Sequence, residues 1–483
     1  MPRKNRKPAG QPKPAAPAAE PETKGPGGRR TWWVAGGIAA LGLYLACARG
    51  DLWLDEIWSL EWARGIVSPS DLIAKYRHDN NHVLNTAWLW LAGPSAPPWL
   101  YRLPAALSGT AALMLLAALA SRIQRGAGIF AWVLGFFSFP FVLYFSEARG
   151  YAMAAACGTA AAWLLLRQNF RPSWLSVAGF SILSIVGLLS HSTFVLVLLA
   201  LGIWTSWASW SGRVGLVAAR LAMWFGFPLV AAVSWYFMFL KGMEIGGGPE
   251  FSIAVVLGHF FGHGLGLPIT WPWSVIAIAL GVALLAAGWH FTPDRQHHLR
   301  ALLCGVIIAP VLVLLATRPT FLYFRYFFVL LPFIYLFAAV AMAGIWKMAW
   351  PSGRVAVVSV LALYVLSQAM AVGNLVRFGR GQYSDALLVI ASSPDADKSL
   401  TSDHDFRNGM LVGFLQRRDA RFESIRYMAG APQPAKWHLL HTQDPLPSEI
   451  PTEQAVGSAT YRLTGIFPYG GVSGWHWILY RRD

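Results

Sequence analysis

Residues 326–345 read Y-F-F-V-L-L-P-F-I-Y-L-F-A-A-V-A-M-A-G-I, without one charged side chain. A helix rises about 1.5 Å per residue, so a run of this length covers the roughly 30 Å of hydrocarbon in a bilayer. Similar runs of about 16 to 22 apolar residues recur along the chain. The sequence therefore predicts an all-α polytopic membrane protein with about eleven transmembrane helices, at residues 32–48, 102–121, 127–145, 150–166, 173–190, 193–210, 218–240, 272–289, 301–316, 326–345 and 355–373.

The composition excludes a soluble globular protein. Of the 483 residues, 55% are hydrophobic and 13% are charged, whereas an ordinary soluble protein carries about 25% charged residues. The net charge of +16 does not indicate nucleic acid as a partner, because eight of the Lys and Arg residues lie in the Pro/Ala/Gly-rich segment 1–30. We expect this segment to be a disordered basic cytoplasmic tail, followed by an uncleaved membrane anchor.

The charges between the expected spans predict the orientation of the chain. With the N-terminus in the cytoplasm, every cytoplasmic loop carries two basic residues, as the positive-inside rule requires. The opposite loops carry acidic residues, and the odd number of spans places the C-terminus outside. We therefore expect a multi-pass protein of the inner (plasma) membrane with a periplasmic or extracellular C-terminus. The basic pairs are Arg122 and Arg125, Arg167 and Arg171, Arg213 and Arg220, Arg295 and Arg300, and Lys347 and Arg354.

Two loops on the expected outer side are much longer than a turn, residues 49–101 and residues 241–271. The first contains Trp-rich amphipathic stretches at 52–62 and 83–91, which we expect to lie along the membrane interface. The chain ends in a strand-like run at 474–480. The sequence thus predicts a tail (1–30), a transmembrane domain (31–375) and a small extracytoplasmic α/β domain (376–483).

The peptide D-L-W-L-D-E-I-W-S-L, residues 51–60, places Asp55 and Glu56 directly after the first span. Adjacent carboxylates at a membrane surface repel each other, so they are solvated, paired or used in chemistry. A transferase needs a carboxylate to accept the proton of an attacking hydroxyl group. Successive residues of a helix or strand point apart, so we expect only one of the two to face a reaction centre.

A second polar peptide, R-H-D-N-N-H at residues 77–82, lies in the same outer loop and contributes His78, Asp79 and His82. These side chains could bind a metal, orient a sugar hydroxyl, or form an ordinary polar loop. Their spacing matches no well-defined metal-ligand pattern. In the second long loop, His259 and His263 are four residues apart, which suits one face of a helix and permits a divalent cation. No cofactor is required by these patterns.

Arginine residues on the expected outer side run against the positive-inside rule. They are either snorkelling anchors or ligands of an anion. A lipid phosphate or pyrophosphate would explain them, because a guanidinium group binds phosphate oxygens bidentately and stays charged. The residues concerned are Arg149, beside Glu147 and Tyr151 in F-S-E-A-R-G-Y (145–151); Arg325, beside Tyr326 and before Pro332; and Arg102 and Arg318.

Four of these peptides, in this order and on one side of the membrane, resemble the GT-C glycosyltransferases. They are the Asp55-Glu56 pair, the Asp79-x-x-His82 segment, the peptide around Arg149, and R-Y-x-x-x-x-x-P from Arg325. The resemblance covers about residues 30 to 375 and is to the bacterial protein-mannosyltransferase-like and aminoarabinose-transferase-like branch (glycosyltransferase family 39-like). One departure is that the family's His-Pro-Pro is here His82-Val83-Leu84.

The resemblance implies a GT-C-like fold and a polyprenyl-phosphate-linked sugar donor. It implies catalysis on the outer face and inversion at the anomeric carbon, with a glycan, lipid or protein as acceptor and membrane lipid as surroundings. It assigns the catalytic carboxylate to Asp55, with Glu56 as its neighbour. The residues expected to contact substrate are Asp79, His82, Arg102, Glu147, Arg149, Tyr151, Lys241, Arg325 and Tyr326.

Two alternatives remain open. A transporter or flippase of lipid-linked saccharides would also need many spans and outer cations, but it should carry polar residues near the bilayer midplane. The spans here are nearly free of charge, which favours an enzyme at the membrane surface. The second alternative is an oligosaccharide ligase with a pyrophosphate-linked donor.

Overall fold

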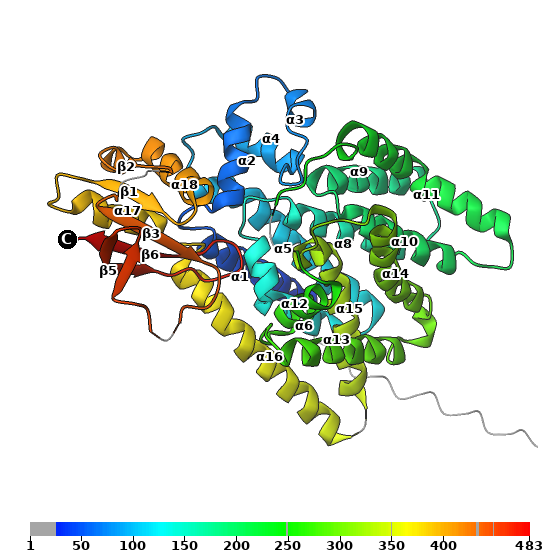
Figure 1. The fold of residues 1–483 in the computed structure, drawn as a ribbon. Coiled ribbons are helices and arrows are strands. Elements are labelled where there is room, and N and C mark those ends of the chain that lie inside the picture. The colour runs from blue at the N-terminus through cyan, green and yellow to red at the C-terminus, as the bar shows by residue number, and fades with distance from the viewer. Residues whose placement is uncertain (1–25, 248–249, 349, 431–433, 448) are drawn as a thin grey trace, which may run out of the picture.

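The structure, a computed structural model, describes residues 26–247, 250–348, 350–430, 434–447 and 449–483. Figure 1 shows a large helical bundle with a small sheet domain at the C-terminal end of the chain. Most of the predicted basic tail (1–30) lies outside the described residues. Its last five residues belong instead to the first helix, α1, which begins at Pro26.

Every apolar run predicted to span the membrane is helical. By length and composition, six helices of the described residues could cross a membrane on their own account, and the remaining ones are shorter. The predicted polytopic fold class is thus confirmed. The bundle helices are α1 (Pro26–Cys47), α5 (Pro98–Ile123), α6 (Ala127–Phe137), α7 (Phe139–Tyr144), α8 (Tyr151–Arg167), α9 (Trp174–Ser190), α10 (Phe194–Ala208), α11 (Val214–Trp235), α13 (Trp273–His290), α14 (Leu299–Thr317), α15 (Leu331–Lys347) and α16 (Pro351–Phe378).

The predicted span 127–145 is not one continuous helix but breaks at Ser138 into α6 and α7. Pro140 follows the break and has no N–H to continue the helical hydrogen bonds. The Ser138 hydroxyl instead accepts a hydrogen bond from the Phe141 amide and caps α7. The break turns the chain just before the loop 145–150, which carries Glu147 and Arg149.

The bundle is centred on α15, whose residues Leu331 to Ala343 are all buried. Helix α15 packs against α5, α6 and α13. On the outer helices the pattern is reversed, with large apolar side chains left exposed. Continuous exposed apolar surface of this kind marks contact with a membrane. Examples are Leu229 on α11, Val282 on α13 and Leu363 on α16.

The first long loop contains helices at the two stretches that the sequence predicted, 52–62 and 83–91, and the second long loop contains a helix as well. The first loop forms α2 (Leu54–Arg64), α3 (Asp71–Ala74) and α4 (Val83–Ala92). The second begins after a π-helical turn (Tyr236–Leu240) and contains α12 (Ile253–Leu265). Helices α2, α3 and α4 lie between the end of α1 and the start of α5, and α12 packs against α13. We call the end of the bundle that carries α2 the domain end, because the C-terminal domain lies there too (Figure 1).

A buried ion pair fixes α2 to α5. Arg102, in the second turn of α5, donates from Nε and Nη2 to the Glu56 carboxylate at 2.8 and 2.6 Å, and both side chains are fully buried. Its other N–H groups donate to the backbone carbonyls of residues 48–51. Glu56 also accepts from the amides of Trp53 and Ala148. The pair therefore joins the end of α1, the start of α2, α5 and the loop 145–150.

The C-terminal domain is a six-stranded sheet with two helices, which confirms the predicted small α/β domain. The strand order is β2-β1-β3-β6-β5-β4; β1 is parallel to β2 and β3, and the other pairs are antiparallel. Its position outside the membrane stays a prediction. The elements are α17 (Tyr383–Ser392), β1 (Ser399–Ser402), α18 (Asp405–Arg418), β2 (Arg426–Tyr427), β3 (Trp437–Thr442), β4 (Glu453–Val456), β5 (Ala459–Phe467) and β6 (His476–Arg482).

The two faces of β6 pack into different cores, as the two-residue repeat of a strand requires. Trp477 and Leu479 point to the side covered by α17 and α18. This core also contains Trp53 and Ile57 of the first loop. The amphipathic helix α2 is thus packed between the membrane bundle and the sheet domain.

We predict that replacing Arg102 by Gln lowers the free energy of unfolding by about 3–5 kcal/mol, because the Glu56 carboxylate would stay buried without its partner. Denaturant unfolding in detergent micelles, followed by tryptophan emission, measures this. The matched control is Arg64→Gln, which breaks the exposed Arg64–Glu61 pair on α2. That variant should change stability by less than about 1 kcal/mol. Equal effects of the two changes would contradict the role given to the buried pair.

Candidate active site

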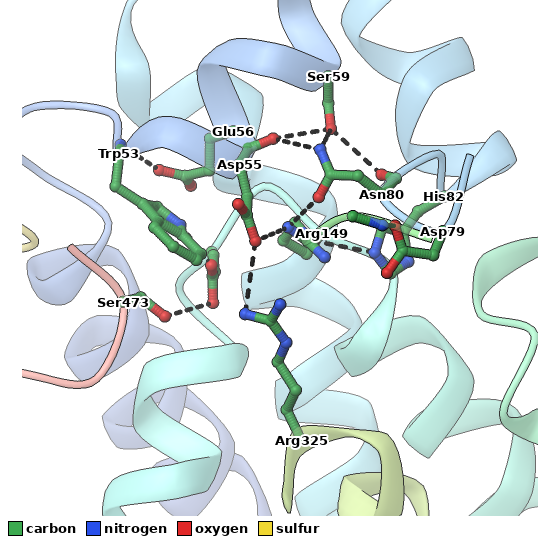
Figure 2. A network of polar contacts seen from close by, with 12 residues as sticks. Trp53, Asp55, Glu56, Ser59, Asp79, Asn80, His82, Arg149, Arg325 and Ser473 are labelled. Atoms are coloured by element: carbon green, nitrogen blue, oxygen red, sulfur yellow. Dashed lines mark hydrogen bonds and ion pairs between the residues drawn. The ribbon is translucent and has the colours of Figure 1, made fainter. Parts of the chain in front are cut away.

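Asp55 lies at the meeting point of three elements that are far apart in the sequence (Figure 2). It is in the first turn of α2, and its carboxylate is 14% exposed. Its Oδ2 is 2.5 Å from Nη1 of Arg149 and 3.5 Å from Nη1 of Arg325. Arg149 comes from the loop before α8, and Arg325 from the 3₁₀ turn Phe324–Leu330 before α15. Two guanidinium groups thus face one carboxylate and leave an excess of positive charge.

Glu56 does not share this environment. Figure 2 shows its carboxylate turned away from that of Asp55, as the helical geometry requires. Burial alone would raise the pKa of Glu56, but the charge of Arg102 and its hydrogen bonds outweigh burial and lower the pKa. Because Glu56 is fully buried and paired, the expectation that it is catalytic is corrected here. It is a structural residue that orients α2.

Arg149 is held on a second side by the peptide 77–82. Its Nη1 also donates to Oδ1 of Asn80 at 2.5 Å, and its Nε donates to Nε2 of His82 at 3.0 Å. Nδ1 of His82 lies 3.1 Å from the Ser190 carbonyl, which can only accept. His82 is therefore the tautomer protonated at Nδ1. Burial and the charge of Arg149 keep its pKa well below the ordinary value, so the ring is neutral.

Asn80 is a site residue that the sequence reasoning missed, although it lies within the quoted peptide 77–82. Its Nδ2 donates to the Asp55 carbonyl at 3.0 Å and to the Ser59 hydroxyl at 3.2 Å. One amide side chain thus holds the backbone of α2 and the guanidinium of Arg149 together. An Asn in a polar loop gives no signal of this role in a single sequence.

Asp79 and Tyr326 meet at the other edge of the site, at 3.2 Å between the Tyr326 hydroxyl and Oδ2 of Asp79. Oδ1 of Asp79 accepts from the Gly246 amide at 3.0 Å. Burial opposes ionisation of Asp79, but hydrogen bonds from His78 and Gly246 prevail and lower its pKa to about 2. A short parallel bridge between His78 and Glu244 joins the same two loops. Asp79 therefore ties the second long loop to the first.

Glu147 links the site to the C-terminal domain. It accepts hydrogen bonds from Nε1 of Trp53 at 2.5 Å and from the hydroxyl of Ser473 at 3.5 Å. Burial raises the pKa of Glu147 to about 7. Ser473 lies in the segment before β6, and Figure 2 shows it reaching the site from a chain segment separate from the bundle helices. No pattern in the sequence indicated that Glu147 and Ser473, which are 326 positions apart, would meet.

Arg380, just after α16, is a second residue that the sequence reasoning missed. It is fully buried and donates to the Cys47 carbonyl at 3.2 Å, to the Leu143 carbonyl at 2.9 Å and to the Ser146 hydroxyl at 3.1 Å. It thus anchors the loop that carries Glu147 and Arg149 to the end of α1. A single Arg after a long apolar helix looks like an interface anchor in sequence.

The surroundings of Arg102 and Lys241 do not fit the substrate contacts that were expected of them. All N–H groups of Arg102 are occupied by Glu56 and by backbone carbonyls, so it has none left for a phosphate. Lys241 is exposed at the end of the π-helical turn, with its Nζ over the ring of Phe237 at 5.7 Å. Among the described residues it makes no contact with the group around Asp55.

Tyr151 is buried beside this group, with its ring 5.4 Å from that of His82 and 4.3 Å from that of His191. Its hydroxyl has no hydrogen-bond partner among the described residues.

His259 and His263 lie on α12 with ring centroids 6.1 Å apart. The described part of the chain has no group of three or more His, Cys, Asp or Glu placed to hold a metal ion. The described residues therefore provide no set of ligands for the divalent cation that the spacing of His259 and His263 permitted.

No protein-family model and no curated protein matches the sequence. Among solved structures, ArnT from Cupriavidus metallidurans in the apo state aligns with 86% of this chain and 93% of its own, at 14% identity and a TM-score of 0.52. The same protein bound to undecaprenyl phosphate aligns over the same shares, at 14% identity and a TM-score of 0.51. The arabinosyltransferase EmbB from Mycobacterium smegmatis aligns with 84% of this chain and 38% of its own, at 13% identity and a TM-score of 0.42.

The similarity to ArnT, an aminoarabinose transferase, extends over nearly the whole of both chains. An identity of 14% indicates a shared fold and nothing finer. The shared architecture covers most of the chain, and the segments that carry Asp55, Arg149 and Arg325 lie among the helices of the bundle. The fold of this protein is that of the solved ArnT structures.

Proposed function

We propose that this protein is a membrane glycosyltransferase that moves a sugar from a polyprenyl-phosphate-linked donor to a hydroxyl group of an acceptor, with inversion, on the outer face of the inner membrane. The observation that carries the proposal is the placement of Asp55 between Arg149 and Arg325. One carboxylate supplies a base, and two guanidinium groups supply binding of an anion. These are the groups that such a transfer needs.

The two arginines are suited to hold the donor phosphate, with the prenyl chain between the bundle helices. Arg325 is 25% exposed, and its Nε has no hydrogen-bond partner among the described residues. Its only ion pair there is the 3.5 Å contact with Asp55. It therefore keeps N–H groups for a phosphate oxygen while it stays beside the carboxylate. Arg149 is held more tightly, by Asn80 and His82, and provides a fixed charge.

The proposed reaction is a single displacement. The acceptor hydroxyl oxygen forms a bond with the anomeric carbon while its proton passes to the Asp55 carboxylate. The bond between the anomeric carbon and the phosphate oxygen breaks, and both of its electrons leave with polyprenyl phosphate. The negative charge that develops on the leaving phosphate is stabilised by fixed guanidinium charge, which is the larger share of the catalysis in this kind of site. Attack opposite the leaving group inverts the anomeric centre.

Two further observations support the proposal. The solved ArnT that shares the fold is described bound to undecaprenyl phosphate, which suggests a lipid-linked donor here too. Moreover, the Asp, Glu, Lys and Arg side chains that are fully buried among the described residues are all at the domain end of the bundle: Glu56, Arg102, Glu147, Arg149 and Arg380. A transporter should instead carry such groups along a path through the midplane.

Replacing Asp55 by Asn should lower transfer by about 10²–10⁴-fold, because the amide cannot accept the proton. Transfer of label from radiolabelled polyprenyl-phosphate sugars to a membrane extract measures this, with the purified protein in detergent. The matched control is Glu61→Gln, another carboxylate of α2, which is half-buried and pairs with Arg64 and Arg417. We expect it to transfer like the wild type. An active Asp55→Asn enzyme of unchanged stability would remove Asp55 from the role of base.

Replacing Arg325 by Gln should lower kcat/KM for the donor by about tenfold to a hundredfold, the effect of losing one charged hydrogen bond. Arg325→Lys should recover part of the loss, since it restores charge without the bidentate geometry. Arg318→Gln, in the same loop and exposed, serves as the control. A larger loss at Arg318 than at Arg325 would be inconsistent with the proposed phosphate contact.

The KM for the donor should rise as the pH increases from about 6 to 8. The cause is Glu147, whose pKa burial raises to about 7. Below this pH Glu147 is neutral, and above it a negative charge appears beside Arg149 and opposes the donor phosphate. Glu147→Gln removes the titrating group, so its donor KM should stay flat over this range. Steady-state kinetics at several pH values test the difference, and an identical rise in both enzymes would rule out Glu147 as its source.

A further inference from the structure

The first turn of α18 contacts α2, the helix that carries Asp55. The ring of Phe406 is 5.8 Å from that of Trp58, and Phe406 is 53% exposed. Trp58 is three residues after Asp55, so both lie on the same face of α2. Trp58 and Trp62 also contact His78, at 4.6 and 5.1 Å between ring centroids. A partly exposed aromatic surface thus runs from the site toward the C-terminal domain.

A charged group of the C-terminal domain adjoins this surface. Nδ1 of His441 donates to the Asp403 carboxylate at 2.8 Å. Its Nε2 is therefore an acceptor, and it accepts from Nη1 of Arg407 at 3.2 Å. The remaining N–H groups of Arg407 have no acceptor among the described residues. Asp403 and His441 thus hold one edge of the guanidinium and leave the other edge available, an arrangement that the proposed transfer step does not use.

Arg407 and Arg325 both influence the hydroxyl group of Tyr323. The guanidinium carbon of Arg325 lies 4.9 Å from the ring centre of Tyr323. Burial raises the pKa of the Tyr323 hydroxyl, and the charges of Arg325 and Arg407 both oppose that rise. The two guanidinium groups are therefore within electrostatic reach of the same side chain. One belongs to the membrane bundle and the other to the C-terminal domain.

Trp475 packs against Arg407 and His441 and has an indole N–H without an acceptor in the described part of the chain. Trp475 is 2% exposed, yet its indole N–H has no acceptor among the described residues. Its ring lies beside Arg407, at 5.9 Å from the guanidinium carbon, and beside His441, at 5.5 Å. A buried N–H without an acceptor costs free energy unless a ligand or water accepts from it. Trp475 thus flanks both Arg407 and His441 and helps to hold the guanidinium group in place.

We propose that Arg407, held by His441 and Asp403, forms with Trp58 and Phe406 a binding subsite for an acceptor saccharide that carries an anionic group. This inference rests on the proposed function, and it names the acceptor's chemical class. The anionic group, a phosphate or carboxylate, would pair with the free edge of Arg407. The apolar face of the sugar ring would lie on the aromatic surface, because flat rings offer large contact area at little entropic cost. The attacking hydroxyl would then point to Asp55.

The proposal is tested by equilibrium binding to the full chain in detergent, measured by titration calorimetry. The probes are N-acetylglucosamine 6-phosphate, glucuronic acid and uncharged N-acetylglucosamine. We expect the wild type to prefer the two anionic sugars, and Arg407→Gln to bind them about tenfold or more weakly, with the uncharged sugar unaffected. Phe406→Ala should weaken all three probes alike. A phosphate-only or carboxylate-only response identifies which anion the subsite takes.

The control is Arg417→Gln, which removes an exposed arginine of the same helix that pairs with Glu61. It should bind like the wild type. Unchanged thermal stability excludes misfolding, and Arg407→Lys should keep part of the preference. The proposal is overturned if the wild type has no preference for anionic sugars, or if Arg325→Gln abolishes the preference while Arg407→Gln retains it. Because binding is measured without turnover, an inactive Asp55→Asn enzyme that binds the probes separates this result from the test of the transferase.

Discussion

The desolvated ion pair between Glu56 and Arg102 sets the geometry on which the site depends. Charges this deeply buried are tolerated only when every donor and acceptor is used, and here they are. The pair fixes the rotation of α2 about its axis. Since neighbouring side chains of a helix diverge, burying Glu56 turns Asp55 toward Arg149 and Arg325. The residue next to the proposed base is therefore essential for orientation without touching the chemistry.

Arginines of the same apparent type in sequence differ in how many of their N–H groups are already occupied. Arg102 is saturated by Glu56 and backbone carbonyls. Arg380 is fully buried and donates to two carbonyls and a hydroxyl, although its Nε has no partner among the described residues, and both arginines hold segments together. Arg325 and Arg407 each keep unpaired N–H groups at a partly exposed position. The first kind stabilises the fold, and the second kind can exchange one partner for a ligand. Two of each kind lie around the domain end of the bundle.

This difference explains how far the sequence could predict the protein. The helical spans were predictable because hydrophobicity is a local property, and the grouping of Asp55, Arg149 and Arg325 followed from placing their loops on one side. The pairing of Arg102 with Glu56 was not predictable, because a buried structural arginine and a phosphate-binding arginine have the same sequence context. Arg380 and Ser473 were also missed, since their partners are hundreds of positions away and no periodic pattern connects them.

The shared core of α2 and the sheet domain has a consequence for biosynthesis. Helix α2 is synthesised well before α17, α18 and β6, which follow it by more than 300 residues. Until then the faces of Trp53 and Ile57 that pack into this core have no native partner. Domains generally form as the chain emerges, but here the first loop is covered only when β6 has been made. The packing of α2 is therefore completed only after β6 has been made, so a chain truncated before β6 would leave this face of α2 uncovered.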